Sequence, residues 1–540
     1  MSWSSGPAMR LMLGRTAGFI ATFFIPVVLV RVLDVAEFGT YKQLFLLFAT
    51  IFPLAQIGMA ESLFYFLPSA ERRGRSFLVN ATLGLAASGL VCLLLLTAGR
   101  SLLASWMSNP RLAEYVPLIG VYLLFMLVSA VLEIALVSRG RYGTAALTYA
   151  GSDVARAALM LMPALLLGSL RWLIYGAVAF ATMRVLATLG YLRAAAPGQE
   201  ALRPSRRLMR AQLAYTMPFQ LAVVFEILQA NVHHYAVSYT FDAATYAIYA
   251  VGCLQVPLVD FIGSSVCNVL MVKMRAAAKA GDRPAVLRLW HAATAELALI
   301  FLPLTAFLII VAGNLVTLLF TDSYAAAVPV FIVWSLSILL SILQTDGFLR
   351  VHAETRFLVL MNVARLIVVL ASVGWLMARL GLPGAALATI AALAVGKAMA
   401  LVRMGRIMEV PVSSLLPWGT LLAVGGVTAA AAAPTALLTW TSPWSRLPLL
   451  IAAAVVFWGC FAIGAAWLDL LPAGFREICG AWRRRLHPMN LRRAARRGNR
   501  ASGTPRASTA GGSWTTSASP ASSAGPSGGA PAAASVPQGE

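Results

Sequence analysis

The chain has 540 residues, of which 60% are hydrophobic and only 11% are charged, and its mean hydropathy is +0.80. Soluble domains are typically about 45–50% apolar and 25% charged, so this composition excludes a chain of water-exposed domains. The formal net charge of +22 would suit nucleic-acid binding, but Lys and Arg cluster in short gaps between apolar runs, as topology determinants do. We therefore expect an all-α integral membrane protein with no nucleic-acid partner.

Apolar runs long enough to cross a bilayer, which takes about 20 residues as a helix, follow one another along most of the chain. The first comes after residues 1–10 and shows no small-residue cleavage pattern, so we interpret it as a span and not as a signal peptide. Residues 168–171 and 381–384 predict tight turns between closely spaced runs. We expect about fourteen spans, at about residues 11–33, 40–67, 77–98, 112–137, 144–168, 171–193, 211–238, 244–273, 288–316, 325–346, 357–379, 381–403, 415–440 and 446–468.

The basic residues alternate between gaps as a many-pass topology requires. If the N-terminus is inside, the inner gaps contain basic clusters at residues 72–75, 193–210 and 273–288, together with the basic tail. The outer gaps contain only Arg31, Arg100, Arg111, Arg171, Arg379 and Arg446. Because cytoplasmic loops carry the excess of Lys and Arg, we predict that both termini are cytoplasmic.

Two segments after the last expected span differ from the rest. Residues 473–497 hold Ile478, Trp482 and Leu486 at helical spacing among many arginines. This pattern predicts a basic amphipathic helix on the inner leaflet, or a solvated charge run that fixes topology. Residues 498–540 are almost entirely Ala, Ser, Gly, Pro and Thr, a composition typical of a disordered tail.

Five cysteines are present, and four of them lie inside apolar segments. No two have metal-ligand spacing such as C-x-x-C. We interpret them as small hydrophobic residues and expect neither disulfides nor a bound metal.

A weak internal repeat divides the expected spans into two sets. Residues 34–41, Asp-Val-Ala-Glu-Phe-Gly-Thr-Tyr, mark the outer turn between the first two spans, and residues 242–249, Asp-Ala-Ala-Thr-Tyr-Ala-Ile-Tyr, mark the turn between the seventh and eighth. Two six-span halves with the same outer turn suggest a duplicated transporter fold. Chance similarity between apolar helices is the alternative.

Several of these segments resemble a known family. Residues 13–19, 29–33 and 37–43 are similar to the opening of polysaccharide-biosynthesis flippases, which share a superfamily with multidrug and toxin extrusion antiporters and lipid II flippases. Residues 246–252 and 319–329 are similar to that family's eighth span and the approach to its tenth.

The resemblance extends over about residues 8–470 and implies a fold and an activity. The fold would be two six-helix lobes, residues 1–200 and 201–410, around a central cavity, with two further helices in residues 411–472. The implied activity is transfer of undecaprenyl-diphosphate-linked oligosaccharide between the leaflets of the bacterial inner membrane, for O-antigen, capsule or exopolysaccharide. Partners would be membrane lipids, and a polysaccharide polymerase with its chain-length machinery.

Basic residues inside spans are the first candidates for a binding site, because an intramembrane charge costs at least about 2.5–3.5 kcal/mol. Arg184 and Arg365 lie near the middle of their spans, where neither can easily reach an interface. Each could bind a substrate phosphate or pair with a neighbouring helix. Arg156 could do the same, but Asp153 lies three residues earlier on the same helical face, which favours an intrahelical pair.

Three further basic residues lie nearer to span ends. Arg15 and Lys42 could extend to an interface instead of binding substrate. The resemblance favours substrate binding by Arg15, because related flippases place a basic residue of the first span in the cavity. Lys397 lies close to the inner end of its span, where anchoring is the alternative to ligand binding.

Acidic residues are candidates for coupling to an ion. Glu226 and His233 fall on one face of the seventh span together with Gln229, where they could relay protons, bind a cation or form a polar seam between lobes. Glu61, Glu133 and Asp260 are single acids that show no partner in the sequence. The family's acid–base pair is replaced here by residues 231–234, Asn-Val-His-His.

Nothing in the sequence indicates an enzyme or a cofactor. No G-x-x-x-x-G-K-[ST] pattern is present, so ATP is not expected to drive transport directly. The alternatives are a drug or cation antiporter of the same superfamily, a membrane glycan polymerase or ligase, and a non-transporting scaffold. A polymerase or ligase needs a sizeable outer loop, and every expected outer gap is short.

Overall fold

The computed structural model describes residues 23–68, 74–194 and 204–470. These residues form helices joined by turns and short loops, and they contain no β-strand. The expectation of an all-α membrane protein is confirmed. The helices before residue 200 are α2 (Val35–Ala55), α3 (Ser62–Phe66), α4 (Gly74–Ala98), α5 (Arg100–Trp106), α6 (Leu112–Ser129), α7 (Val131–Ser138), α8 (Tyr142–Leu167) and α9 (Leu170–Ala194).

The second half of the chain begins with the 35-residue helix α10 (Arg206–Thr240). It continues with α11 (Ala243–Gly252), α12 (Pro257–Lys279), α13 (Arg283–Phe320), η1 (Asp322–Ala327), α14 (Val328–Ser335), α15 (Ser337–Leu340), α16 (Thr345–Val351), α17 (Thr355–Leu380), α18 (Leu382–Met408), η2 (Val412–Leu415), α19 (Trp418–Thr441) and α20 (Arg446–Trp467).

The described part contains twelve helical segments long and apolar enough to cross a membrane. Two of the fourteen expected spans are not among them. The first lies largely outside the described residues, and the seventh is α10, whose mid-helix sequence is rich in Gln, Asn and His. The segments expected at residues 473–497 and 498–540 also lie outside the described residues.

Several predicted spans are discontinuous, so the prediction of single helices at residues 40–67, 244–273 and 325–346 is wrong. The first breaks after α2, where Ile57 and Gly58 adopt positive φ angles before α3 begins. The second breaks between α11 and α12. Pro257 stands at the first turn of α12, where its missing N–H costs nothing but prevents continuation of the preceding helix.

The tight turns expected between closely spaced spans are confirmed. Gly168 ends α8 with φ +61°, and Gly381 separates α17 from α18 with φ +64°. Glycine adopts these left-handed angles without the steric penalty of a side chain.

The two repeat segments fold alike. Asp34 caps α2 by accepting a hydrogen bond from the Glu37 N–H at 2.7 Å, and Asp242 caps α11 by accepting one from the Thr245 N–H at 3.1 Å. Their φ/ψ angles are −66°/166° and −67°/170°. Helices α2 and α11 also pack together, and a Cβ on Gly39 would overlap the Ala243 carbonyl.

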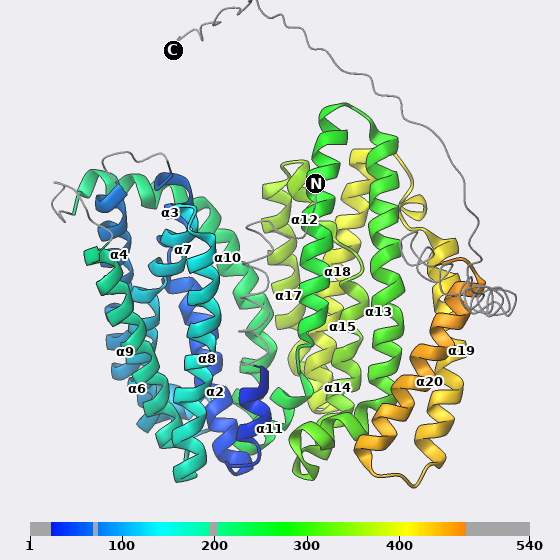
Figure 1. Cartoon of the computed structure of the whole chain (residues 1–540), viewed down its shortest axis with the longest axis horizontal. Coiled ribbons are helices and arrows are strands. Elements are labelled where there is room, and N and C mark those ends of the chain that lie inside the picture. Colours follow the sequence, from blue (N-terminus) through cyan, green and yellow to red (C-terminus); the bar gives the residue numbers. More distant parts are fainter. Residues whose placement is uncertain (1–22, 69–73, 195–203, 471–540) are drawn as a thin grey trace, which may run out of the picture. The chain divides into compact units, whose positions relative to one another are not determined.

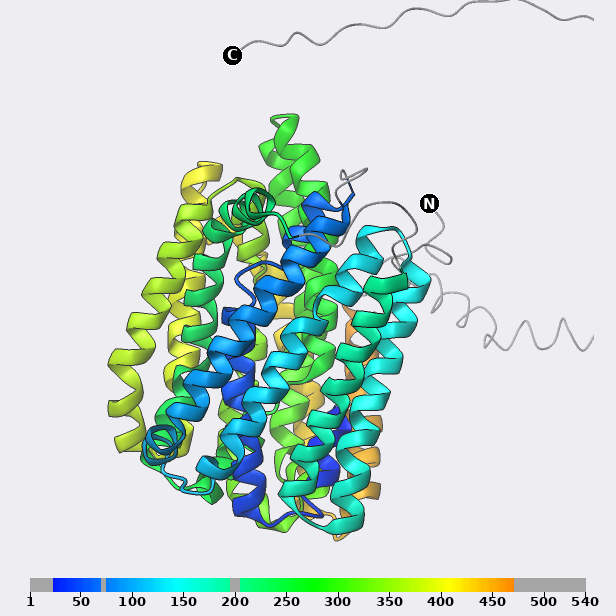
Figure 2. The same ribbon diagram turned by 90° about the vertical axis from the view of Figure 1, so that its left-hand side faces the viewer.

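The spanning helices gather into two bundles, which Figure 1 shows side by side. The N-terminal bundle comprises α2 to α9 and the C-terminal bundle α11 to α18, while α10 contacts helices of both. Figure 2 shows the helices of the N-terminal bundle running along a common direction. Helices α19 and α20 pack against α13 at the far side of the C-terminal bundle (Figure 1), through Phe457 and Phe461 against Phe307 and Ile310.

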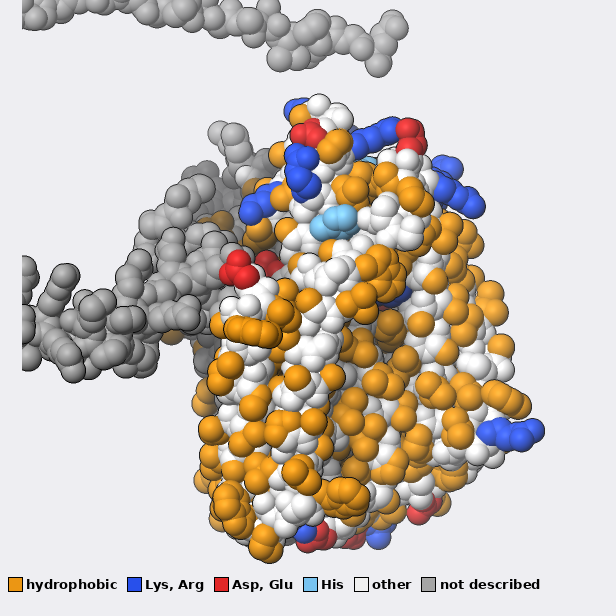
Figure 3. All heavy atoms as spheres, turned by 90° about the vertical axis from the view of Figure 1, so that its right-hand side faces the viewer, with side chains coloured by type: hydrophobic (Ala, Val, Ile, Leu, Met, Phe, Trp, Pro, Cys, Tyr) orange, Lys and Arg blue, Asp and Glu red, His pale blue; other side chains and the backbone are white. Residues whose placement is uncertain are grey.

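The surface has the character that a bilayer requires. Hydrophobic side chains cover the flank in Figure 3, and most Lys and Arg side chains in that view gather at its upper end. Trp440 and Trp467 are 90% and 87% exposed. Such rings suit the membrane interface, where a large apolar side chain can also satisfy its N–H.

Candidate functional site

A cavity of about 540 Å³ opens beside the middle of α10 and the C-terminal bundle. Its volume is within the range of small-molecule sites, about 300–1,000 Å³. None of its lining residues comes from α2 to α9. Among the described residues, its charged lining residues are three acids and three bases: Glu226, Asp260, Asp346, Arg350, Arg365 and Lys397.

Arg365 reaches the cavity from near the middle of α17 and is buried. Its guanidinium lies 3.9 Å from the Asp346 carboxylate and donates to the Asn362 amide oxygen at 3.4 Å. It packs against Gly396 of α18, where a Cβ would overlap its Nε. Among the described residues, that Nε has no hydrogen-bond partner although it is buried.

Lys397 projects from α18 toward the same carboxylate. Its Nζ lies 3.5 Å from Asp346 and donates to the Leu343 carbonyl at 2.8 Å and the Thr345 hydroxyl at 3.2 Å. The carbonyl is available because α15 ends at Leu340 and α16 begins only at Thr345. This break, which the sequence pattern does not reveal, places Asp346 between two cations.

The remaining charged groups of the cavity are less constrained. Glu226 and Asp260 are exposed to it, and within the described ranges neither side chain has a hydrogen bond or an ion pair. Gln229 lines the cavity one helical turn from Glu226, as their spacing predicts. Arg350 is exposed at the C-terminal end of α16.

His233 does not reach the cavity, although it shares a predicted face with Glu226. It is buried, and its Nδ1 lies 2.5 Å from the Tyr249 hydroxyl. Ligand atoms of His233, His234 and Cys253 all lie within 4.8 Å of one another. The spacing of these residues along the chain does not predict this cluster, because Cys253 comes from the end of a different helix, α11.

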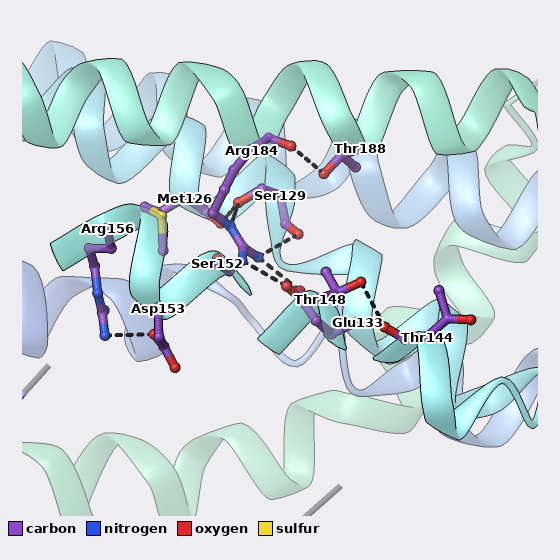
Figure 4. A network of polar contacts seen from close by, with 10 residues as sticks. All are labelled: Met126, Ser129, Glu133, Thr144, Thr148, Ser152, Asp153, Arg156, Arg184 and Thr188. Atoms are coloured by element: carbon purple, nitrogen blue, oxygen red, sulfur yellow. Dashed lines mark hydrogen bonds and ion pairs between the residues drawn. The ribbon is translucent and has the colours of Figure 1, made fainter. Parts of the chain in front are cut away.

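Arg184 forms a separate buried network inside the N-terminal bundle (Figure 4). Its two terminal nitrogens donate to the two carboxylate oxygens of Glu133 at 2.7 and 2.8 Å, and its Nε donates to the Ser129 hydroxyl at 3.1 Å. The Ser152 hydroxyl also accepts from it. The Arg184 and Glu133 side chains are only 11% and 5% exposed.

Arg156 pairs with Asp153 at 2.8 Å, so the intrahelical pair predicted from their spacing is confirmed. Figure 4 shows this pair beside the Arg184 network. The Nζ of Lys42 lies 5.4 Å from the ring centre of Phe38. Glu61 is exposed just before α3. Arg15 lies outside the described residues.

Comparison with known proteins identifies the family of this sequence and solved structures with a similar fold. A family model described as polysaccharide biosynthesis protein matches residues 28–329, more than half of the chain. The chain belongs to this family. No curated protein sequence matches it significantly.

Solved structures of transporters share the fold of this polysaccharide biosynthesis protein. The lipid II flippase MurJ in an inward closed conformation is similar with a TM-score of 0.64 at 15% identity, over 84% of this chain and 98% of that chain. A multidrug resistance MATE family transporter of the MOP superfamily is similar in its outward-facing conformation, with a TM-score of 0.53 at 16% identity over 76% and 97% of the two chains. A multidrug resistance MATE family transporter of the MOP superfamily in an inward-facing conformation is similar with a TM-score of 0.52 at 14% identity, over 76% of this chain and 99% of that chain.

The two bundles of this family member are joined at the end that carries Asp34 and Asp242. Arg31 donates to the Leu318 and Leu319 carbonyls at the end of α13, each at 2.8 Å. Carbonyls at the C-terminus of a helix lack partners within the helix and favour a cation. Direct contacts between the bundles therefore include both this capping interaction and the packing of α2 on α11.

Proposed function

We propose that the chain translocates an undecaprenyl-diphosphate-linked oligosaccharide across the bacterial inner membrane for surface polysaccharide biosynthesis. The observation that carries the proposal is that Arg365 and Lys397 line one cavity among membrane-spanning helices and share one carboxylate, that of Asp346. Each intramembrane cation costs at least about 2.5–3.5 kcal/mol, so a pair that keeps a net positive charge favours a ligand of opposite charge. A diphosphate headgroup supplies that charge.

The lining residues suggest how such a headgroup would bind. Arg365 and Lys397 offer charge-assisted hydrogen bonds to phosphate oxygens. The amides of Gln229, Asn268 and Gln344 also line the cavity and suit sugar hydroxyls. The lipid tail stays in the bilayer, so only the polar part needs the cavity.

Movement of the headgroup requires the cavity to face the two sides in turn. The bundles are joined at the end predicted to be outer, where Arg31 caps α13. We propose that these contacts break in an outward-open state while each bundle moves as a body. No covalent bond changes in this cycle, which suits a transporter better than a polymerase or ligase. A polysaccharide polymerase with its chain-length machinery would then use the translocated product.

We propose structural roles for two of the basic residues considered from the sequence. Arg184 is held by a buried carboxylate in the N-terminal bundle, and Arg156 by Asp153. Lys42 lies against aromatic rings near the end that joins the bundles. For Arg15, substrate binding remains a proposal that rests on the family resemblance.

Drug or cation antiport is the second candidate, and Glu226 and Asp260 favour it. Both acids face the cavity, and neither side chain has an ion pair or hydrogen bond among the residues described. A cationic substrate would need these acids and would be repelled by Arg365 and Lys397. Loss of drug resistance in Glu226→Gln or Asp260→Asn, with normal glycan export, would favour antiport.

The test uses a deletion strain complemented with Arg365→Gln, Lys397→Gln and the double variant. Arg356→Gln is the matched control, because Arg356 is an exposed basic residue of α17 that does not line the cavity. We expect the double variant to reach wild-type membrane abundance, to make no surface polysaccharide and to accumulate lipid-linked repeat units on the cytoplasmic leaflet. Normal polymer from an abundant double variant, or accumulation on the outer leaflet, would overturn the proposal.

A further inference from the structure

The Asp346 carboxylate lies between Arg365 and Lys397, where an anionic ligand would bind both cations. It lies 3.9 Å from the Arg365 guanidinium and 3.5 Å from the Lys397 ammonium. Its third partner is the Thr345 hydroxyl, which donates at 3.0 Å. The side chain is 41% exposed to the cavity, while those of Arg365 and Lys397 are 6% and 15% exposed.

This arrangement satisfies the cations only in part. At 3.5 and 3.9 Å the carboxylate is outside good hydrogen-bond distance of either. The Nε of Arg365 is buried without a partner in the described part of the chain. The cations therefore retain donors that a closer anion could use.

We infer that Asp346 is a resident counter-anion that the substrate headgroup displaces, and that the site takes up one proton at Asp346 for each headgroup bound. The inference rests on the proposed function. With Asp346 ionised, its group with Arg365 and Lys397 has one net positive charge, too little to offset both charges of a diphosphate diester. With Asp346 protonated, the two cations are free to offset both.

A proton fits this role better than a metal cation. A carboxylate keeps its charge while cations flank it, and it takes up a proton when an anion claims those cations in a poorly solvated site. A sodium ion would have to lie beside two positive side chains, whereas a proton binds on the carboxylate itself. The charged and titratable groups that face this site from the surrounding helices are Glu226 of α10, Asp260 and Cys267 of α12, Arg350 of α16, Arg365 of α17 and Lys397 of α18.

The consequence is that transport is coupled to protons. Headgroup and proton would enter the site together and leave it together when Asp346 returns to its cations. Release on the other side of the membrane would then depend on the proton concentration there.

The test is calorimetry on the purified full chain in detergent, with farnesyl-diphospho-N-acetylglucosamine as the probe. Its phosphate diesters stay ionised across the pH range used, so any proton uptake belongs to the protein. Titration in buffers of different ionisation enthalpy gives the number of protons taken up. We expect about one for the wild type in mildly acidic to neutral solution, and affinity that falls as the pH rises.

Asp346→Asn should abolish the proton uptake and bind the probe at least about tenfold more tightly at alkaline pH, the scale of one charge-assisted hydrogen bond. Glu296→Gln, at an exposed acid of α13 that does not line the cavity, is the matched control and should keep the proton uptake. Proton uptake that is lost in Glu226→Gln or Asp260→Asn but kept in Asp346→Asn would overturn the inference. Wild type and Asp346→Asn that bind equally, with no proton taken up by either, would overturn the inference and leave the proposed function standing. No binding to any variant, Asp346→Asn included, would instead overturn the proposed function.

Discussion

Replacing Arg184 tests whether its network in the N-terminal bundle is structural. Arg184→Gln leaves Glu133, whose side chain is 5% exposed, with no opposite charge at 2.7 Å. Removing one partner of a buried pair costs about 3–5 kcal/mol, because the other charge stays desolvated. That is a large part of the stability of an ordinary domain, about 5–15 kcal/mol.

The measurements are membrane abundance and the thermal unfolding midpoint of the purified protein in detergent. We expect Arg184→Gln and Glu133→Gln each to lower both strongly. Arg184→Met combined with Glu133→Leu should recover most of the loss, since an apolar pair of similar volume replaces a buried ion pair at little cost. Arg184→Lys should fall between, because a lysine cannot donate to both carboxylate oxygens in the same planar geometry.

An assay of transport distinguishes a structural role of Arg184 from a substrate-binding role. If Arg184 only holds α9 to the α6–α7 span, the stable double variant should restore surface polysaccharide to the deletion strain. An Arg184→Gln protein of wild-type stability and abundance that exports no polysaccharide would refute the structural role and return Arg184 to the substrate path.

Two glycine substitutions probe contacts without changing charge. Gly396→Ala should push the Arg365 guanidinium away from α18 and weaken probe binding about tenfold, the equivalent of one lost hydrogen bond to a charged group, as measured by calorimetry. Its control, Gly374→Ala, adds a methyl group where nothing lies within 4 Å and should bind normally. Gly39→Ala should separate α2 from α11 and increase the labelling of cysteines introduced at that end of the bundles. Gly313→Ala, which also meets nothing within 4 Å, should label as the wild type does; equal labelling of the two variants would contradict the assigned contact.

Features set by neighbouring residues could be predicted from the sequence. The turns at Gly168 and Gly381 follow from the φ angles that only glycine adopts easily, and the Arg156–Asp153 pair follows from helical spacing. The equivalence of Asp34 and Asp242 followed from their shared role as helix caps. In each case the determining contacts lie within a few residues of one another along the chain.

Partners from other helices could not be predicted in this way. Glu133 and Arg184 are 51 positions apart, and nothing in either segment identifies the other. Asp346 and Arg350 stand at the end of an apolar run, where charged residues ordinarily fix topology. Only the break between α15 and α16 turns them toward the cavity, and a short unwound segment leaves little trace in an apolar sequence.

The two bundles differ in how completely their buried charges are paired. In the N-terminal bundle, Arg184 makes a two-pronged pair with Glu133. In the C-terminal bundle, Arg365 lies 3.9 Å from its carboxylate and keeps a buried donor without a partner among the described residues. A fully paired charge adds rigidity, whereas a partly paired one keeps binding energy for a ligand. The incomplete pairing around Asp346 thus distinguishes the C-terminal bundle as the one in which we place the substrate.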